Sequence, residues 1–358
     1  MSSRALLLWV LAASVVIAAD KKEIDVSASA PADQQWIDSG IDLKAGDLVT
    51  ISATGSVQYD GARSTGPEGL ARGWMDLVMQ FPVNAAGRGA LVGRIGDSPA
   101  ARAFLVGANS TKAAPVAGHL FLGINQMPSS PGTGSFHVVI EHKVGVSPKA
   151  ASGPIPAFTQ EMLEQLPTRV NDAQGNLGDR VNFVVIGSQE NVQTALSAAG
   201  WVPVDKTKGD AVVTGLLRSL SKEAYVSMPM SELELFGRVQ DFGYAQGDPL
   251  MVVASRHHFR IWRAPFKAGE ETVWAGAGTH DIGFEKDQRN GHVTHKIDPV
   301  TDGERDYIGQ SFMQSGMVVK EEYLTAAHAI KEARTATGGG FSSDGRTLII
   351  YLQREAQK

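Results

Sequence analysis

The sequence predicts two domains, an all-β sandwich followed by an α+β domain. The chain has 358 residues, which is longer than one typical domain. Apolar residues recur with a period of two between residues 24 and 144, whereas a continuous apolar run and then a helical stripe follow residue 180. The formal net charge of −5 argues against a nucleic-acid-binding protein, because such domains are usually basic.

The N-terminal segment has the features of a secretory signal. Arg4 precedes an apolar run from Ala5 to Ile17, and small residues lead to the charged Asp20. We therefore expect residues 1–19 to be a signal peptide and the mature chain to be exported, periplasmic or secreted, without a membrane span. An uncleaved N-terminal anchor is the alternative. The chain contains no cysteine, so the exported protein has to be stabilised by core burial without disulfides.

Residues 20–144 form the predicted sandwich. Between Leu48 and Tyr59, Val49, Ile51 and Val57 lie on one face of a strand and polar residues lie on the other. Shorter alternating runs cover residues 119–124 and 134–140, and turn-forming clusters separate them. Short alternating strands without a helical pattern are typical of a β-sandwich.

Residues 145–178 are expected to be a linker, rich in Pro, Gly, Ser and Ala at its start and ending in a short helix at residues 159–165. The second domain is expected to cover residues 179–358. Phe183–Ile186 is a run of apolar residues, which indicates a strand buried on both faces. Ser188 can cap a helix that ends at Gly200. Further helices are predicted at residues 210–221 and 302–314, with strands between them and at the C-terminal end.

The stretch from Arg256 to Tyr307 carries most of the chemistry, because five of the nine histidines lie in it beside Arg, Asp and Trp. On a strand, Arg256, His258, Arg260 and Trp262 share one face. Two guanidinium groups on one stripe suit a phosphate or carboxylate ligand. We take the candidate ligand-binding residues to be Arg238, Arg256, His258, Arg260, Trp262 and Arg305; a solvated or salt-bridged face is the alternative. His257 faces apolar neighbours and is interpreted as a core histidine.

A second group combines histidines with carboxylates. His280, Asp281, His295 and Asp298 are the candidate catalytic residues, and with Asp302 they are of the types that bind zinc or manganese. No spacing forces them together, so the metal and cofactor stay undetermined. Thr301 and Glu304 also fit a helix capping box without any catalytic role. We expect Arg256, Arg260, His280, Asp281, His295 and Asp298 to gather in one pocket at neighbouring strand ends.

The second domain resembles the C-terminal domain of LssY-type bacterial envelope proteins, over about residues 180–314. The matching motifs are Ala199-Gly200-Trp201, Met228-Pro229-Met230-Ser231, Arg256-His257-His258, Thr279-His280-Asp281 and Thr294-His295-Lys296. The resemblance implies an envelope context and names no reaction.

The first domain, about residues 24–144, is similar to the galactophilic lectin (LecA) type of galactose-binding, jelly-roll-like sandwich. The motifs are Gly66-Pro67-Glu68-Gly69, the stretch from Gly89 to Gly96, and the stretch from Gly118 to Asn125. In that family a calcium ion bridges the protein to sugar. The resemblance places Tyr59, Asn125 and Gln126 at the corresponding position, but Gln126 stands where the family has Asp and no second carboxylate follows, so we expect the site to be degenerate.

Three functions remain open from the sequence. The first is an exported envelope protein that binds an anionic or carbohydrate ligand, the second is a metal-dependent hydrolase of phosphoester or glycan bonds, and the third is a structural or scaffolding envelope protein. Whether the chain is an enzyme is undecided at this point, and nucleic acid is not an expected partner.

Overall fold

A computed structural model describes residues 20–31, 34–61, 64–71, 81–145, 154–204, 230–247, 255–286, 288, 291 and 293–353. The expected signal peptide, most of the proline- and glycine-rich linker, the helix expected at 210–221 and the Met228-Pro229 part of the motif lie outside these residues.

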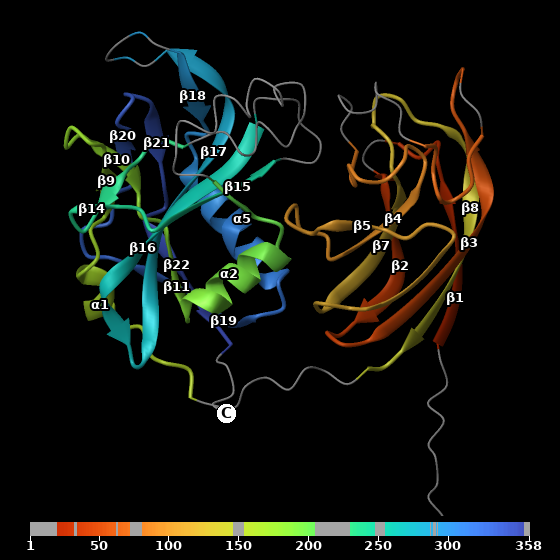
Figure 1. The fold of residues 1–358 in the computed structure, drawn as a ribbon, viewed down its shortest axis with the longest axis horizontal. Helices are drawn as coiled ribbons and strands as arrows, with labels where there is room; N and C mark the ends of the chain where they lie inside the picture. Colours follow the sequence, from red (N-terminus) through yellow and green to blue (C-terminus); the bar gives the residue numbers. More distant parts are fainter. Residues whose placement is uncertain are drawn as a thin grey trace, which may run out of the picture.

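The N-terminal domain is a β-sandwich, drawn in red to yellow in Figure 1. One sheet has the order β1 (Asp20–Ser27), β8 (Thr133–Lys143), β3 (Leu48–Gln58), β6 (Asn109–Ala113), and the other has the order β2 (Trp36–Leu43), β7 (Gly118–Ile124), β4 (Leu91–Ile95), β5 (Ala103–Leu105). Val49, Ile51 and Val57 of β3 are buried together with Phe136 and Val138 of β8. The sandwich and its inward faces are therefore confirmed.

A mixed sheet of eight strands forms the centre of the C-terminal domain, within the part of the chain that the structure describes. Its order is β12 (Val202–Pro203), β15 (Phe242–Gly247), β16 (Ser255–Ala268), β17 (Glu271–Lys286), β11 (Phe183–Ile186), β22 (Arg346–Leu352) and β19 (Val318–Thr325), and β18 (Val293–Ile297) also pairs with β17. β11 and β22 are parallel, whereas the other pairs are antiparallel.

Both faces of this sheet are covered. Helices α2 (Gln189–Ala198) and α5 (Thr301–Met313) pack on one face, where Phe183 and Val185 contribute to the core. Val184 and Ile186 point to the other core, as expected for a strand buried on both sides. That second core includes α1 (Gln160–Glu164) and the small sheet β10 (Leu177–Arg180), β9 (Arg169–Asn171), β13 (Glu234–Leu235), β14 (Arg238–Val239). A further pair, β20 (Glu332–Arg334) and β21 (Gly340–Ser342), completes the domain.

The helix ends follow local rules. The Ser188 side chain accepts a hydrogen bond from the backbone N–H of Asn191 at the start of α2. The helix terminates at Gly200, whose φ of +83° suits glycine. Thr159 caps α1 in the same way as Ser188 caps α2.

The second domain begins earlier than the expected residue 179. Phe158, Leu163, Leu166 and Val170 are buried in its core beside Trp262. The expected linker at residues 145–178 therefore contains core residues of the C-terminal domain, and only its earlier part has the composition of a linker.

Candidate functional site

The chemistry-bearing residues lie at the end of β16 and β17 where these strands pair. Arg256 is opposite Asp281, His257 is opposite His280, and His258 is opposite Thr279. Because side chains alternate along a strand, the Arg256–Asp281 pair and the His257–His280 pair face opposite sides of the sheet. All of these side chains except that of His280 are at least nine-tenths buried.

On the face away from α5, one carboxylate contacts three basic side chains. Asp281 accepts hydrogen bonds from Arg256 Nε at 2.9 Å and His258 Nε2 at 2.9 Å, and its Oδ2 lies 3.5 Å from His295 Nδ1. We call these four residues the Asp281 cluster. Asp281 is fully buried, whereas the His295 side chain is 29% exposed and marks the side from which solvent reaches the cluster.

The electrostatics of the Asp281 cluster are unusual. Burial alone would raise the pKa of the Asp281 carboxyl, but His258, Arg256 and His295 together hold its pKa well below the ordinary value of 3.8. Burial lowers the pKa of His295 below 6.5, and Asp281 opposes that shift. Asp281 is therefore ionised over the whole physiological range and offers a fixed negative centre to its three partners.

The rest of the predicted stripe on this face is buried rather than open. Arg260 is 5% exposed and donates from Nε to the backbone carbonyl of Ser231 at 3.0 Å. Trp262 is fully buried in the core with Val184 and Ala275. The assignment of Trp262 to ligand contact is thus wrong, because the strand continues into the domain interior at that point.

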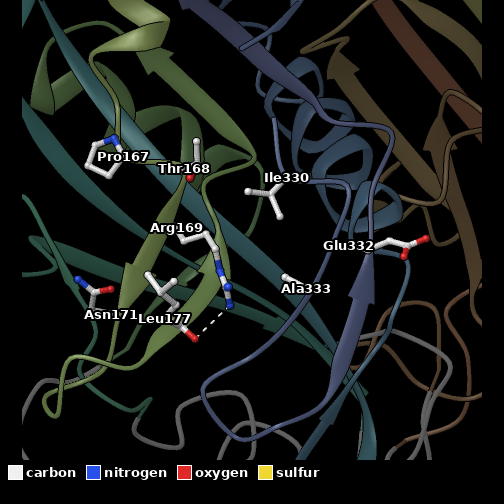
Figure 2. A pocket seen from close by; sticks show the side chains of 8 residues that line it. All are labelled: Pro167, Thr168, Arg169, Asn171, Leu177, Ile330, Glu332 and Ala333. Atoms are coloured by element: carbon white, nitrogen blue, oxygen red, sulfur yellow. Dashed lines mark hydrogen bonds between the residues drawn. The ribbon is translucent and has the colours of Figure 1, made fainter. Parts of the chain in front are cut away.

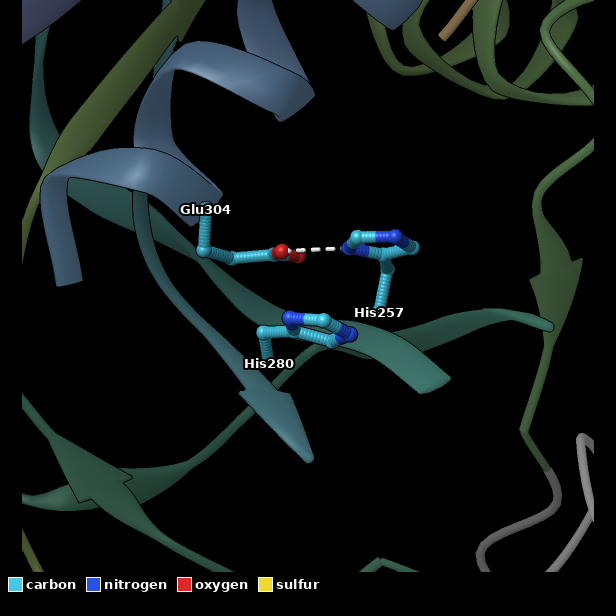
Figure 3. A group of neighbouring side chains, drawn as sticks. All are labelled: His257, His280 and Glu304. Atoms are coloured by element: carbon cyan, nitrogen blue, oxygen red, sulfur yellow. Dashed lines mark hydrogen bonds and ion pairs between the residues drawn. The ribbon is translucent and has the colours of Figure 1, made fainter. Parts of the chain in front are cut away.

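Figure 3 shows a second group on the face beneath α5. His257 Nδ1 and Glu304 Oε2 share a hydrogen bond of 2.6 Å. The His257 ring stacks against the rings of both His280 and Tyr307, with centroid distances of 4.3 and 3.6 Å. The Tyr307 hydroxyl in turn donates to Gln246 Oε1 at 3.0 Å. Two histidines and a carboxylate therefore converge here, with the rings fixed by stacking.

Glu304 was expected to belong to a capping box, and that expectation is wrong. The N-cap of α5 is Val300, with no side-chain hydrogen bond to the helix. Thr301 already lies in the helix and donates to Ser342 O. Glu304 is only 3% exposed and points to the sheet, so its role is to contact His257 rather than to close the helix end.

Asp298 and Asp302 take up separate positions. The Asp298 carboxylate accepts the backbone N–H of Val300 at 2.8 Å and so stabilises the turn before α5. Asp302 accepts hydrogen bonds from Ser343, the Asp344 N–H and Arg305. Neither contact brings these carboxylates to His280 or His295, as a shared metal site would require.

Two of the candidate arginines are held by carboxylates. The guanidinium of Arg305 contacts Asp302, Asp306 and Asp344 at 2.7–3.1 Å, and its side chain is 1% exposed. Arg238 pairs with Asp241 at 2.8 Å and donates to Arg263 O. Because these guanidinium groups are already engaged, the structure favours an architectural role for both over ligand capture.

The prediction of one common pocket is therefore wrong. Arg256, Asp281 and His295 do come together, but His280 lies on the opposite face. The interpretation of His257 as a core histidine is confirmed, since it is buried and hydrogen-bonded to Glu304. Sequence reasoning missed Glu304 and Tyr307 as its partners. The i, i+3 spacing of Glu304 and Tyr307 on one helix face was a signal that could have drawn attention to them.

In the sandwich, the three residues at the calcium-like position are engaged in internal hydrogen bonds. Tyr59 donates to Gln126 Oε1 at 2.8 Å, and the N–H of Gly132 donates to the same oxygen at 3.0 Å. Gln126 Nε2 donates to Ala28 O. The Asn125 amide binds backbone groups around residues 83–87 and is fully buried. These contacts give all three residues a structural role.

A surface hollow of about 560 Å³ lies elsewhere, beside β9 and β20 (Figure 2). Its Arg169 guanidinium donates to the backbone carbonyls of Leu177 and Gly178. The hollow is lined by Pro167, Thr168, Arg169, Asn171, Leu177, Ile330, Glu332 and Ala333, none of which is a candidate site residue.

Fold and site together define a two-domain protein in which a β-sandwich precedes a mostly β domain with few helices and buried His–carboxylate groups. Residues 163–347 match the family described as "LssY C-terminus". This match spans more than half of the chain, so the protein belongs to that family.

The N-terminal part is similar to a solved structure described as "EclA N-terminal domain; PllA-like lectin". The two are 20% identical, the alignment covers 34% of this chain and 96% of that chain, and the TM-score is 0.27. No curated protein matches the sequence. Among the described residues, no helix is long and apolar enough to span a bilayer.

Proposed function

We propose that this chain is an exported protein of the bacterial cell envelope and that its C-terminal domain binds an anionic envelope ligand at the Asp281 cluster. The observation that carries this proposal is that the basic side chains around Asp281 outnumber the carboxylate. One carboxylate faces Arg256, His258 and His295. Arg256 alone neutralises it, so protonation of His295 leaves the cluster with net positive charge.

A positive cluster of this kind suits phosphate or carboxylate groups. Guanidinium and protonated imidazole groups donate charge-assisted hydrogen bonds, which are stronger than neutral ones. His295 is the partly exposed member, so an anion would meet the cluster at His295 first.

The sandwich is proposed to be a scaffold or recruiting module for the envelope. Its Tyr59, Asn125 and Gln126 are used internally, which supports the scaffolding role over calcium-dependent sugar binding. Carbohydrate binding elsewhere on the sandwich would be a separate activity from the anion site.

The test uses the full chain with two probes, pyrophosphate and polygalacturonate, in calorimetric titrations at low salt. We expect binding that strengthens from pH 8 to pH 5.5 and weakens with added salt. His295→Asn should reduce the affinity, whereas His119→Asn, an exposed histidine of the sandwich, should not. Absence of binding by both probes at pH 5.5, or wild-type affinity in His295→Asn, would contradict the proposal.

Export has its own test. Residues 1–19 carry the charged start and apolar run of a signal peptide. N-terminal sequencing of protein from the envelope or medium should give Ala19 or Asp20 as the first residue. A chain that still begins at Met1 would instead support the uncleaved anchor.

A hydrolase of phosphoester or glycan bonds is the second candidate function. The observation that favours it is the His257–Glu304 hydrogen bond beside His280, since paired His and carboxyl groups perform acid–base chemistry. Turnover of chromogenic phosphate and glycoside esters that is lost in Glu304→Gln would support it, and no turnover with any of them would count against it.

A further inference from the structure

His257, His280 and Glu304 have the arrangement of a three-ligand metal site. Each offers one nitrogen or oxygen atom, and these atoms lie within 4.8 Å of one another (Figure 3). The two histidines are opposite each other in the β16–β17 pair, and Glu304 reaches them from the first turn of α5. Three separate elements therefore deliver the groups to one point.

The imidazole rings of His257 and His280 are stacked on each other in the structure. The planes of His257 and His280 are inclined by 11°, and those of His257 and Tyr307 by 6°. Tyr307 is itself fixed by its hydrogen bond to Gln246. Because the lone pair of an imidazole nitrogen lies in the ring plane, two stacked rings do not both point at one ion. His280, the partly exposed ring, therefore has to turn about its Cβ–Cγ bond before both histidines coordinate the same ion.

The carboxylate provides an independent indication of a ligand. Glu304 is 3% exposed, and among the described residues no group donates to its Oε1. A buried polar atom without a hydrogen-bond partner destabilises the fold. The cost is larger when the atom is an oxygen of a carboxylate. A cation at this point would supply the missing partner and the missing positive charge.

The donor set selects the class of ion. Imidazole nitrogens suit zinc, iron, copper and nickel, whereas calcium and magnesium prefer oxygen ligands only. Two histidines and one glutamate leave further positions open for water or a ligand, as in catalytic zinc sites. Ligand bonds of about 2.0–2.1 Å would draw the three atoms somewhat closer together than they now lie.

We propose that His257, His280 and Glu304 bind one divalent first-row transition-metal ion, with Tyr307 positioning His257. The proton now shared by His257 and Glu304 would be released when the ion binds. This site lies on the opposite face of the sheet from the Asp281 cluster and does not depend on anion binding there.

The experiment begins with full-length protein purified without chelator, whose metal content is measured by mass spectrometry. Chelator-treated protein is then titrated with Zn²⁺ and Co²⁺, with Mg²⁺ and Ca²⁺ as controls. We expect one equivalent of Zn²⁺ or Co²⁺, a visible Co²⁺ spectrum typical of nitrogen and oxygen ligands, and no comparable binding of Mg²⁺ or Ca²⁺.

Three variants locate the ion. Glu304→Gln and His280→Asn should each weaken Co²⁺ binding by more than about 100-fold. Loss of a residue that only supports a metal ligand typically weakens binding by roughly 10–100-fold. His119→Asn, an exposed histidine of the sandwich, should bind Co²⁺ like wild type. Circular dichroism and thermal melting establish that each variant is folded, and Glu304→Gln keeps the shape of the side chain.

Two results would overturn the proposal. One is wild-type protein that takes up no transition metal at neutral pH. The other is a folded Glu304→Gln or His280→Asn that binds Co²⁺ with wild-type affinity and spectrum. Because pyrophosphate binding is measured separately, failure of the metal site leaves the anion-site proposal to its own test.

Discussion

His280 and Asp281 are consecutive residues of β17 whose side chains lie on opposite faces of the central sheet. His280 stacks on His257 beneath α5, whereas Asp281 accepts hydrogen bonds from Arg256 and His258 on the other face. This alternation divides one histidine-rich segment into two chemically different groups. The face beneath α5 contains the His–Glu group proposed to bind a cation, and the opposite face contains the Asp281 cluster proposed to bind an anion.

Glu304→Gln is expected to change how stability depends on pH in the metal-free protein. The pKa of Glu304 is raised in the folded state, so the folded chain keeps a proton that the unfolded chain loses above about pH 4.5. Wild-type stability therefore falls as pH rises from 4.5 through the raised folded value. The variant cannot ionise, so it should gain stability relative to wild type at pH 8 and not at pH 4.

Urea unfolding of both proteins in the presence of a chelator, between pH 4 and pH 9, measures this difference. Glu332→Gln is the control because Glu332 is exposed. A parallel pH dependence for wild type and Glu304→Gln would show that Glu304 does not titrate in this way.

Asp281→Asn should be strongly destabilising. Asp281 pairs with Arg256 at 2.9 Å, and both side chains are almost fully buried. Loss of one partner of a buried pair costs about 3–5 kcal/mol. Chemical denaturation at pH 7 measures the loss, with Asp25→Asn, whose side chain is 74% exposed, as the control.

The contribution of the Asp281 carboxylate to stability is expected to decline in acid. The pKa of Asp281 is depressed in the folded state, so its contribution is fully present above the ordinary value of 3.8 and is lost as pH falls below it. The stability difference between wild type and Asp281→Asn should therefore shrink below pH 3.8. A difference that stays constant down to pH 2 would be inconsistent with the assigned pairing.

Arg305→Met should destabilise the fold by about 3–5 kcal/mol, because it leaves Asp302, Asp306 and Asp344 without their shared cation. Arg346→Met is the matched control, since Arg346 also pairs with Asp344 but is half exposed, where a pair contributes about 0–1 kcal/mol. Equal unfolding midpoints for the two variants would contradict a stabilising role of Arg305 in the fold.

Calcium-dependent galactose binding should be weak or absent. Gln126 Oε1 already accepts two hydrogen bonds, and an amide brings no negative charge to a calcium ion. Calorimetry of the full chain with galactose at millimolar calcium should show no heat of galactose binding. Tight binding that a chelator abolishes would prove this expectation wrong.

The sequence by itself determined the two-domain fold and much of each strand's orientation. Period-two alternation placed Val49, Ile51 and Val57 in the sandwich core, and the apolar run Phe183–Ile186 predicted a strand covered on both sides. The motifs around Arg256 and Thr279 were sufficient to recognise the LssY family. These features depend on local periodicity and on contiguous residues, which a sequence displays directly.

Only the tertiary structure decided which polar groups meet. The pairing register of β16 with β17 set His257 against His280, and the packing of α5 brought Glu304 to them from 24 residues further along the chain than His280. Register and helix docking depend on contacts between distant segments, so no local pattern reveals them. For the same reason Glu304 resembled a capping residue in the sequence, and Arg305 was a candidate ligand-binding residue, although it pairs with Asp344.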